Sequence, residues 1–171
     1  YLAVAVKNSA ISHLRRMQRN KERHVEILEP EVEQELIHQA DVQWLSNWQQ
    51  CVLDQAWRGL FHHQRKSPGN LFHTILKARS EHVDLDDAEV ASRVAEAIGQ
   101  PLRPEAFRKQ LSRARRMFAE LIVEEVARTL ESPTPDKVEE ELIGTGLMSF
   151  VRPFLRTDWR VRALLADADA N

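Results

Sequence analysis

Cysteine, tyrosine and glycine are scarce in this chain of 171 residues. Cys51 is its single cysteine, so no disulfide can form within the chain, and its place in an apolar helical pattern predicts a small buried thiol. The five glycines and seven prolines fall mostly between periodic segments, as breaks between helices do. No glycine-rich phosphate loop, nucleophile elbow or metalloprotease helix is present. The common motifs for phosphate binding and nucleophilic catalysis are therefore absent.

Long hydrophobic runs are also missing, since no apolar stretch approaches the roughly 20 residues that a membrane span requires. The first 24 residues lack the apolar core of a secretory signal. Hydrophobic residues make up 43% and charged residues 29% of the chain, which is typical of a globular protein. These features predict a cytoplasmic protein with no membrane partner.

The net charge of −2 conceals alternating segments of opposite sign. Residues 1–24 are basic, 25–41 carry acids and no Lys or Arg, 103–116 are basic again, and 119–141 are mostly acidic. A nucleic-acid binder needs a local basic patch rather than a basic protein. The pI of about 6.4 therefore does not exclude DNA as a partner.

Helical periodicity runs through almost the whole chain and predicts an all-α fold, a helical bundle. Asp86 is suited to the N-cap of a helix that Gly99 ends, and Ser67-Pro68-Gly69-Asn70 predicts a turn. The expected parts are a helix at 1–24, an acidic linker at 25–40, a helical domain at 41–131 and a helical extension at 132–171. Within them we expect helices from about 41 to the turn at 67, and at 71–80, 88–98, 103–130 and 136–143.

The basic segment 103–118 combines an apolar face with a cationic one. Pro104 suits a first helical position, and at 100° per residue one narrow face is apolar. That face consists of Phe107, Leu111, Ala114 and Phe118. Lys109, Ser112, Arg113 and Arg116 lie opposite, with Arg108 and Arg115 on the flank. Such a helix suits the major groove of DNA, although most basic helix faces are simply solvated.

The preceding helix favours the DNA interpretation. It ends at Gly99, and Gln100-Pro101-Leu102 turns the chain into the basic segment. A helix, a short turn and a basic amphipathic helix follow one another in the order of a helix-turn-helix.

Two segments resemble bacterial sigma-70-type transcription initiation factors of the small extracytoplasmic-function group. Tyr1-Leu2 followed by Lys7-Asn8-Ser9-Ala10-Ile11-Ser12-His13-Leu14-Arg15-Arg16 resembles the end of that family's region 2, with Lys7 and Ser12 where the family has arginine and aspartate. Ala106-Phe107-Arg108-Lys109-Gln110-Leu111-Ser112-Arg113-Ala114-Arg115-Arg116 resembles the recognition helix of region 4. Residues 1–24 would then be the trailing helix of a truncated region 2.

The resemblance implies a sequence-specific DNA-binding protein, not an enzyme, that directs core RNA polymerase to a promoter minus-35 element. It implies no cofactor and no metal, and it allows a regulatory anti-sigma protein as a further partner. By position, Arg108, Lys109 and Arg113 would face bases, whereas Arg103, Arg115 and Arg116 would meet phosphates. Gln110 and Ser112 belong to the same DNA-binding set, and Lys7, Asn8, Arg15 and Arg16 are candidates in the region 2 remnant.

Other interpretations compete with this one. Adjacent His62 and His63 project to different sides of a helix, so a zinc site is disfavoured. Trp44, Trp48 and Trp57 could stack on bases, but at helical spacing they more often belong to a core. The main alternative is a helical protein-interaction module without a DNA role, whose basic face docks an acidic partner. In either case residues 25–41 could cover the basic patch.

Overall fold

The computed structural model describes residues 30–67 and 69–160, with 30–40 as backbone, and in these residues the protein consists of helices joined by turns. The helices are α2 (Pro30–Lys66), α3 (Phe72–Glu81), α4 (Asp87–Ile98), α5 (Pro104–Arg128), α6 (Pro135–Gly144) and α7 (Met148–Val151). This range contains no strand, so the all-α prediction is confirmed. None of the described helices has the length and apolar character needed to cross a membrane. The helix expected at 1–24, with Lys7, Asn8, Arg15 and Arg16, lies outside the described residues.

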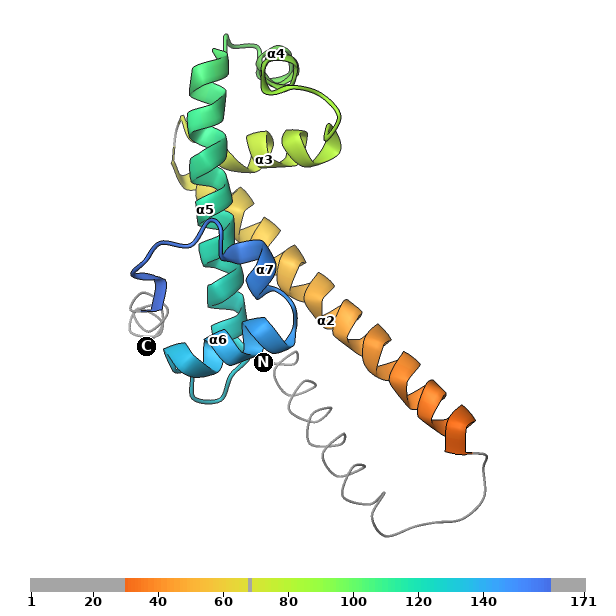
Figure 1. Cartoon of the computed structure of the whole chain (residues 1–171). Coiled ribbons are helices and arrows are strands. Elements are labelled where there is room, and N and C mark those ends of the chain that lie inside the picture. Colours follow the sequence, from red (N-terminus) through yellow and green to blue (C-terminus); the bar gives the residue numbers. More distant parts are fainter. Residues whose placement is uncertain (1–29, 68, 161–171) are drawn as a thin grey trace.

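Two long helices, α2 and α5, cross each other, and the shorter helices pack around them (Figure 1). Helices α3 and α4 lie beside the N-terminal half of α5, and α6 and α7 pack near its C-terminal half. Two separate hydrophobic cores result, one at each end of α5.

Helix α2 begins earlier than expected. The acidic linker predicted at 25–40 is wrong for residues 30–40, because these form the first turns of α2. Pro30 occupies the first helical position, where its missing N–H costs nothing, and the glutamates that follow are good helix formers. The boundary predicted between residues 40 and 41 therefore falls inside a continuous helix.

The buried stripe of α2 is narrow. Val52, Ala56 and Leu60 recur every four residues and are buried. Cys51 is exposed, so the predicted buried thiol is wrong, because one residue of offset turns a helical side chain by about 100°. Trp48 and Trp57 are half-buried beside the stripe.

Helix α4 begins and ends as predicted. Asp86 accepts hydrogen bonds from the backbone N–H groups of Ala88 and Glu89, both at 2.8 Å. The Glu89 carboxylate accepts from the backbone N–H of Asp86 in return, which completes a capping box. Gly99 adopts the left-handed conformation, with φ of 65°, and ends the helix.

Helix α5 links the two cores because its apolar face rotates along its length. Phe107 and Leu111 join Ile75, Val90 and Val94 in the core with α3 and α4. Further along α5, a second apolar set packs against α2, α6 and α7: Ala119, Ile122, Val123, Val126 and Ala127. The two halves of the helix therefore have different partners.

Candidate nucleic-acid interface

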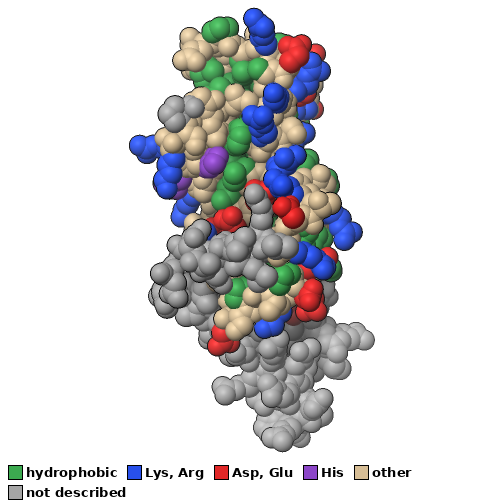
Figure 2. All heavy atoms as spheres, turned by 90° about the vertical axis from the view of Figure 1, so that its left-hand side faces the viewer, with side chains coloured by type: hydrophobic (Ala, Val, Ile, Leu, Met, Phe, Trp, Pro, Cys, Tyr) green, Lys and Arg blue, Asp and Glu red, His purple; other side chains and the backbone are tan. Residues whose placement is uncertain are grey.

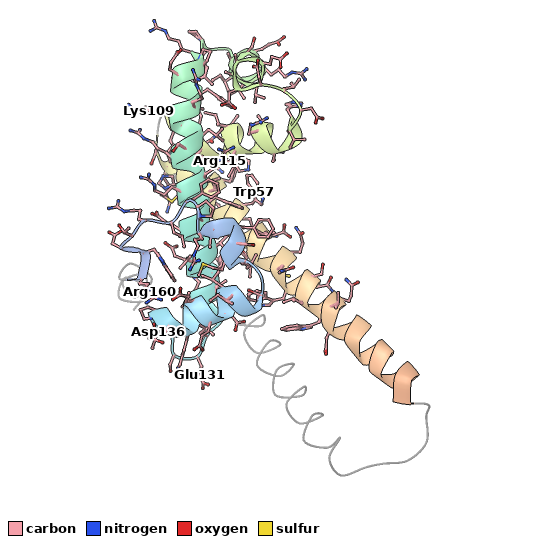
Figure 3. All side chains as sticks on the ribbon, viewed as in Figure 1. Trp57, Lys109, Arg115, Glu131, Asp136 and Arg160 are labelled. Atoms are coloured by element: carbon pink, nitrogen blue, oxygen red, sulfur yellow. The ribbon has the colours of Figure 1, made fainter. Side chains whose placement is uncertain are left out.

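The cationic face of α5 is exposed along the N-terminal half of the helix. Phe107 and Leu111 are buried in the core with α3 and α4, and Ala114 is buried on the same side of α5, so the opposite side of the helix faces solvent. That side presents the predicted residues Arg108, Lys109, Ser112, Arg113 and Arg116, all of them exposed. Figure 3 labels Lys109 on the N-terminal half of α5. Figure 2 shows Lys and Arg side chains gathered over the upper half of that side of the molecule.

Few of these cations are neutralised within the protein. Arg108 lies 3.7 Å from the Glu105 carboxylate, and both side chains are more than half exposed. Such surface pairs are weak and easily exchanged for another anion. Among the described acidic side chains, none forms an ion pair with Lys109, Arg113 or Arg116. Their charge is therefore available to a polyanion.

The start of α5 adds further donors to this face. Arg103 is the N-cap residue, it is exposed, and its side chain makes no capping hydrogen bond. Pro104 follows at the first helical position, as predicted. Backbone N–H groups of an uncapped first turn, together with the positive end of the helix dipole, are common phosphate ligands.

Gln110 has a structural task. Its side-chain oxygen accepts a hydrogen bond from the backbone N–H of Leu71 at 3.0 Å, directly before α3. A second glutamine, Gln64, holds the same region by bonding both the backbone N–H and the hydroxyl of Thr74. These bonds fix α3 against α2 and α5. The sequence carries no signal for them, because glutamine at such spacing is equally common on solvated faces.

Arg115 lies apart from the open cationic face. It is half-buried, and its guanidinium carbon is 5.8 Å from the centre of the Phe154 ring, beyond α7. It also lines a cavity between α2, α3, α5 and the α7 region. The structure therefore groups Arg103, Arg108, Lys109, Arg113 and Arg116 together and separates Gln110 and Arg115 from them.

The sign of the charge changes along α5. Beyond residue 119 the helix carries Glu124 and Glu125, and Arg128 forms ion pairs with both. Burial raises the pKa of Glu124; the charge of Arg128 opposes this rise, and nearby glutamates add to it. Because these carboxylates would repel phosphates, a nucleic acid would be confined to the N-terminal half of α5.

The basic face is open to solvent in the described part of the chain. Residues 30–40, which the charge pattern alone would place in a linker able to cover 103–116, belong to the far end of α2 (Figure 1). That end points away from the start of α5. Residues 30–41 therefore do not cover the basic face, although the charge pattern alone would have allowed it, because they lie in the part of α2 that is distant from the start of α5.

Comparisons with protein-family models, with curated proteins and with solved structures gave no match for this chain. By its fold, the described part of the chain is an all-α protein in which one long helix, α5, takes part in two hydrophobic cores.

Proposed function

We propose that this protein is a sequence-specific DNA-binding transcription initiation factor of the sigma type. The N-terminal half of α5 would enter the major groove of a promoter minus-35 element. The observation that carries the proposal is the exposed row of Lys109, Arg113 and Arg116, without acidic partners among the described residues, on a helix whose opposite side is buried.

Helices α4 and α5 would act as the helix-turn-helix unit. Gly99 ends α4, residues 100–103 turn the chain, and Pro104 starts α5. The core with α3 supports α5 from behind through Phe107 and Leu111. A recognition helix needs this rigid support, because its side chains must reach base edges in a fixed register.

The cations would divide between two tasks. Lys109 and Arg113 lie centrally on the exposed face and would reach the bases, together with Arg108 at its edge. Arginine pairs with guanine through two parallel hydrogen bonds, and lysine bonds the same acceptors. Arg103 and Arg116, at the two ends of the row, would contact phosphates and set the position of the helix.

The proposal includes the partners of a sigma factor. Core RNA polymerase would supply the chemistry of RNA synthesis, and an anti-sigma protein would regulate access.

The test is fluorescence anisotropy with labelled duplexes of minus-35 type whose central base pairs are varied, titrated at several salt concentrations. The wild-type chain is compared with the Lys109→Ala/Arg113→Ala double variant. The matched control is Lys137→Ala/Arg152→Ala, which removes two exposed cations from the other end of the molecule.

We expect the wild type to prefer particular sequences. The Lys109→Ala/Arg113→Ala variant should lose that preference. Its plot of log affinity against log salt should be flatter by about 0.9 for each phosphate that the variant no longer neutralises, while the control keeps the wild-type slope. Absence of DNA binding at low salt would refute the proposal. The exposed cations would then favour the alternative, a protein-interaction module whose basic face docks an acidic protein.

A further inference from the structure

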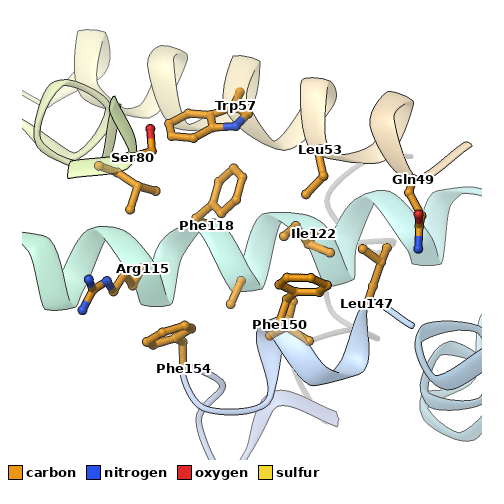
Figure 4. Close-up of a pocket in the computed structure, with 13 residues that line it drawn as sticks. Gln49, Leu53, Trp57, Ser80, Arg115, Phe118, Ile122, Leu147, Phe150 and Phe154 are labelled. Carbon is orange, nitrogen blue, oxygen red and sulfur yellow. The ribbon is translucent and has the colours of Figure 1, made fainter. Parts of the chain in front are cut away.

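A cavity of about 400 Å³ lies between α2, α3, α5 and the α7 region (Figure 4). Its walls are mainly apolar and aromatic, and they come from four helices and the turn after α7: Trp57 on α2, Leu76 on α3, Phe118 and Ile122 on α5, Phe150 on α7, and Phe154 after it. Pockets for small organic ligands span about 300 to 1,000 Å³ and have walls of this kind. The size and composition therefore suit a small molecule with an apolar body.

Three polar side chains reach the cavity, and two of them are engaged elsewhere. The Gln49 side-chain amide donates to the Thr145 carbonyl at 2.5 Å, and the Ser80 hydroxyl donates to the Lys77 carbonyl at 2.7 Å. The third is Arg115, which has no ion pair or hydrogen bond with any described residue. Arg115 is thus a half-buried cation, without a hydrogen-bond or ion-pair partner among the described residues, at one end of a mainly apolar cavity that is partly open to solvent.

Arg115 has an aromatic neighbour at this end of the cavity. Its guanidinium lies against the Phe154 ring, which shields one side of the charge from water. Figure 4 shows Arg115 and Phe154 at one end of the cavity and Gln49 at the other, with Phe118 and Ile122 between them. A ligand with an anionic end near Arg115 and an apolar body that extends along α5 would match this arrangement.

We propose that this cavity binds an amphipathic carboxylate, with Arg115 as the counter-charge and the aromatic walls around the apolar body. The guanidinium fork matches a carboxylate through two parallel hydrogen bonds, and this pairing is stronger in a partly water-excluded site. Trp57, Phe118 and Phe150 would remove the body of the ligand from water. The proposal requires no DNA, so it stands or fails separately from the proposed function.

Isothermal titration calorimetry with sodium octanoate and with 1-octanol tests the proposal on the full chain. The two probes share an apolar body and differ in the anionic end. We expect the wild type to bind octanoate more tightly than octanol. Arg115→Met, which keeps the apolar stem and removes the charge, should weaken octanoate binding about tenfold to a hundredfold and leave octanol binding unchanged.

Two further variants make the result specific. Phe150→Ala should weaken both probes, and it should fold normally because Phe150 is 69% exposed. Arg58→Met is the charge-matched control, since Arg58 is exposed next to Trp57 but does not line the cavity. It should bind both probes like the wild type. The proposal is overturned if octanoate does not bind, if Arg115→Met binds it as tightly as the wild type, or if Phe150→Ala has no effect.

Discussion

Replacing Phe107 with alanine should unfold one end of the molecule and spare the other. Phe107 is 0% exposed and lies in the core formed by α3, α4 and the start of α5. A buried aromatic side chain removes about 150 to 250 Å² from water. At about 25 cal/mol per Å² this is worth roughly 4 to 6 kcal/mol. Alanine retains part of that area, so we expect a loss of about 3 to 5 kcal/mol.

A loss of that size matters because a whole domain is stable by only about 5 to 15 kcal/mol. The other core, with α6 and α7, contains no atom of Phe107. Hydrogen exchange followed by mass spectrometry should therefore show faster exchange in α3, α4 and the first turns of α5. Exchange in α6 and the second half of α5 should stay close to that of the wild type.

Leu142→Ala is the matched variant, because Leu142 is also 0% exposed but belongs to the second core. It should cost about 2 to 5 kcal/mol and reverse the pattern, so that exchange rises in α6 and α7 and stays low in α4. If both variants accelerate exchange equally in every helix, α5 joins the two cores into a single cooperative unit. The reasoning from two separate cores would then be refuted.

Two smaller perturbations test the local chemistry by urea unfolding. Asp86→Ala removes the N-cap of α4 and should lower the free energy of unfolding by about 1 kcal/mol. Asp84→Ala, at an exposed position nearby, is the control and should lower it much less. Equal losses in the two variants would refute the capping argument. Burial, aided by Lys77, lowers the pKa of His73, which packs against the Trp57 and Phe61 rings. The unfolded chain then binds more protons below about pH 6.5, so His73 should make stability fall as pH drops through that value. His73→Phe should flatten the dependence between about pH 5 and 7, and an unchanged slope would contradict this.

The parts of the fold that local chemistry determines can be predicted from the sequence. Asp86 and Gly99 mark the ends of α4 because each satisfies backbone groups within a few residues of itself. The burial of Phe107, Leu111 and Ala114 follows from their spacing alone. The start of α2 cannot be predicted in this way, because Pro30 and the acids after it suit a linker and a first helical turn equally well.

The contacts that individual side chains of the candidate site make depend on residues that are distant in the sequence. Sequence position places Gln110 and Arg115 on the DNA-binding face with the other polar residues of their helix. Gln110 instead bonds the backbone of Leu71, and Arg115 lies over Phe154. Periodicity places a residue on one side of a helix, but it does not say which loop or helix meets that side.

Substitution of Arg115 distinguishes the proposed ligand cavity from the proposed DNA-binding face. It lies on the same helix as Lys109 and Arg113, yet it faces the cavity near Phe154 rather than the open cationic row. If both proposals hold, Arg115→Met should weaken octanoate binding while the salt dependence of DNA binding stays close to that of the wild type. Lys109→Ala/Arg113→Ala should do the reverse, because those side chains do not line the cavity. A large loss of DNA affinity in Arg115→Met would instead return Arg115 to the phosphate role that its sequence position implies. The charge of Arg115 would then serve mainly to attract DNA.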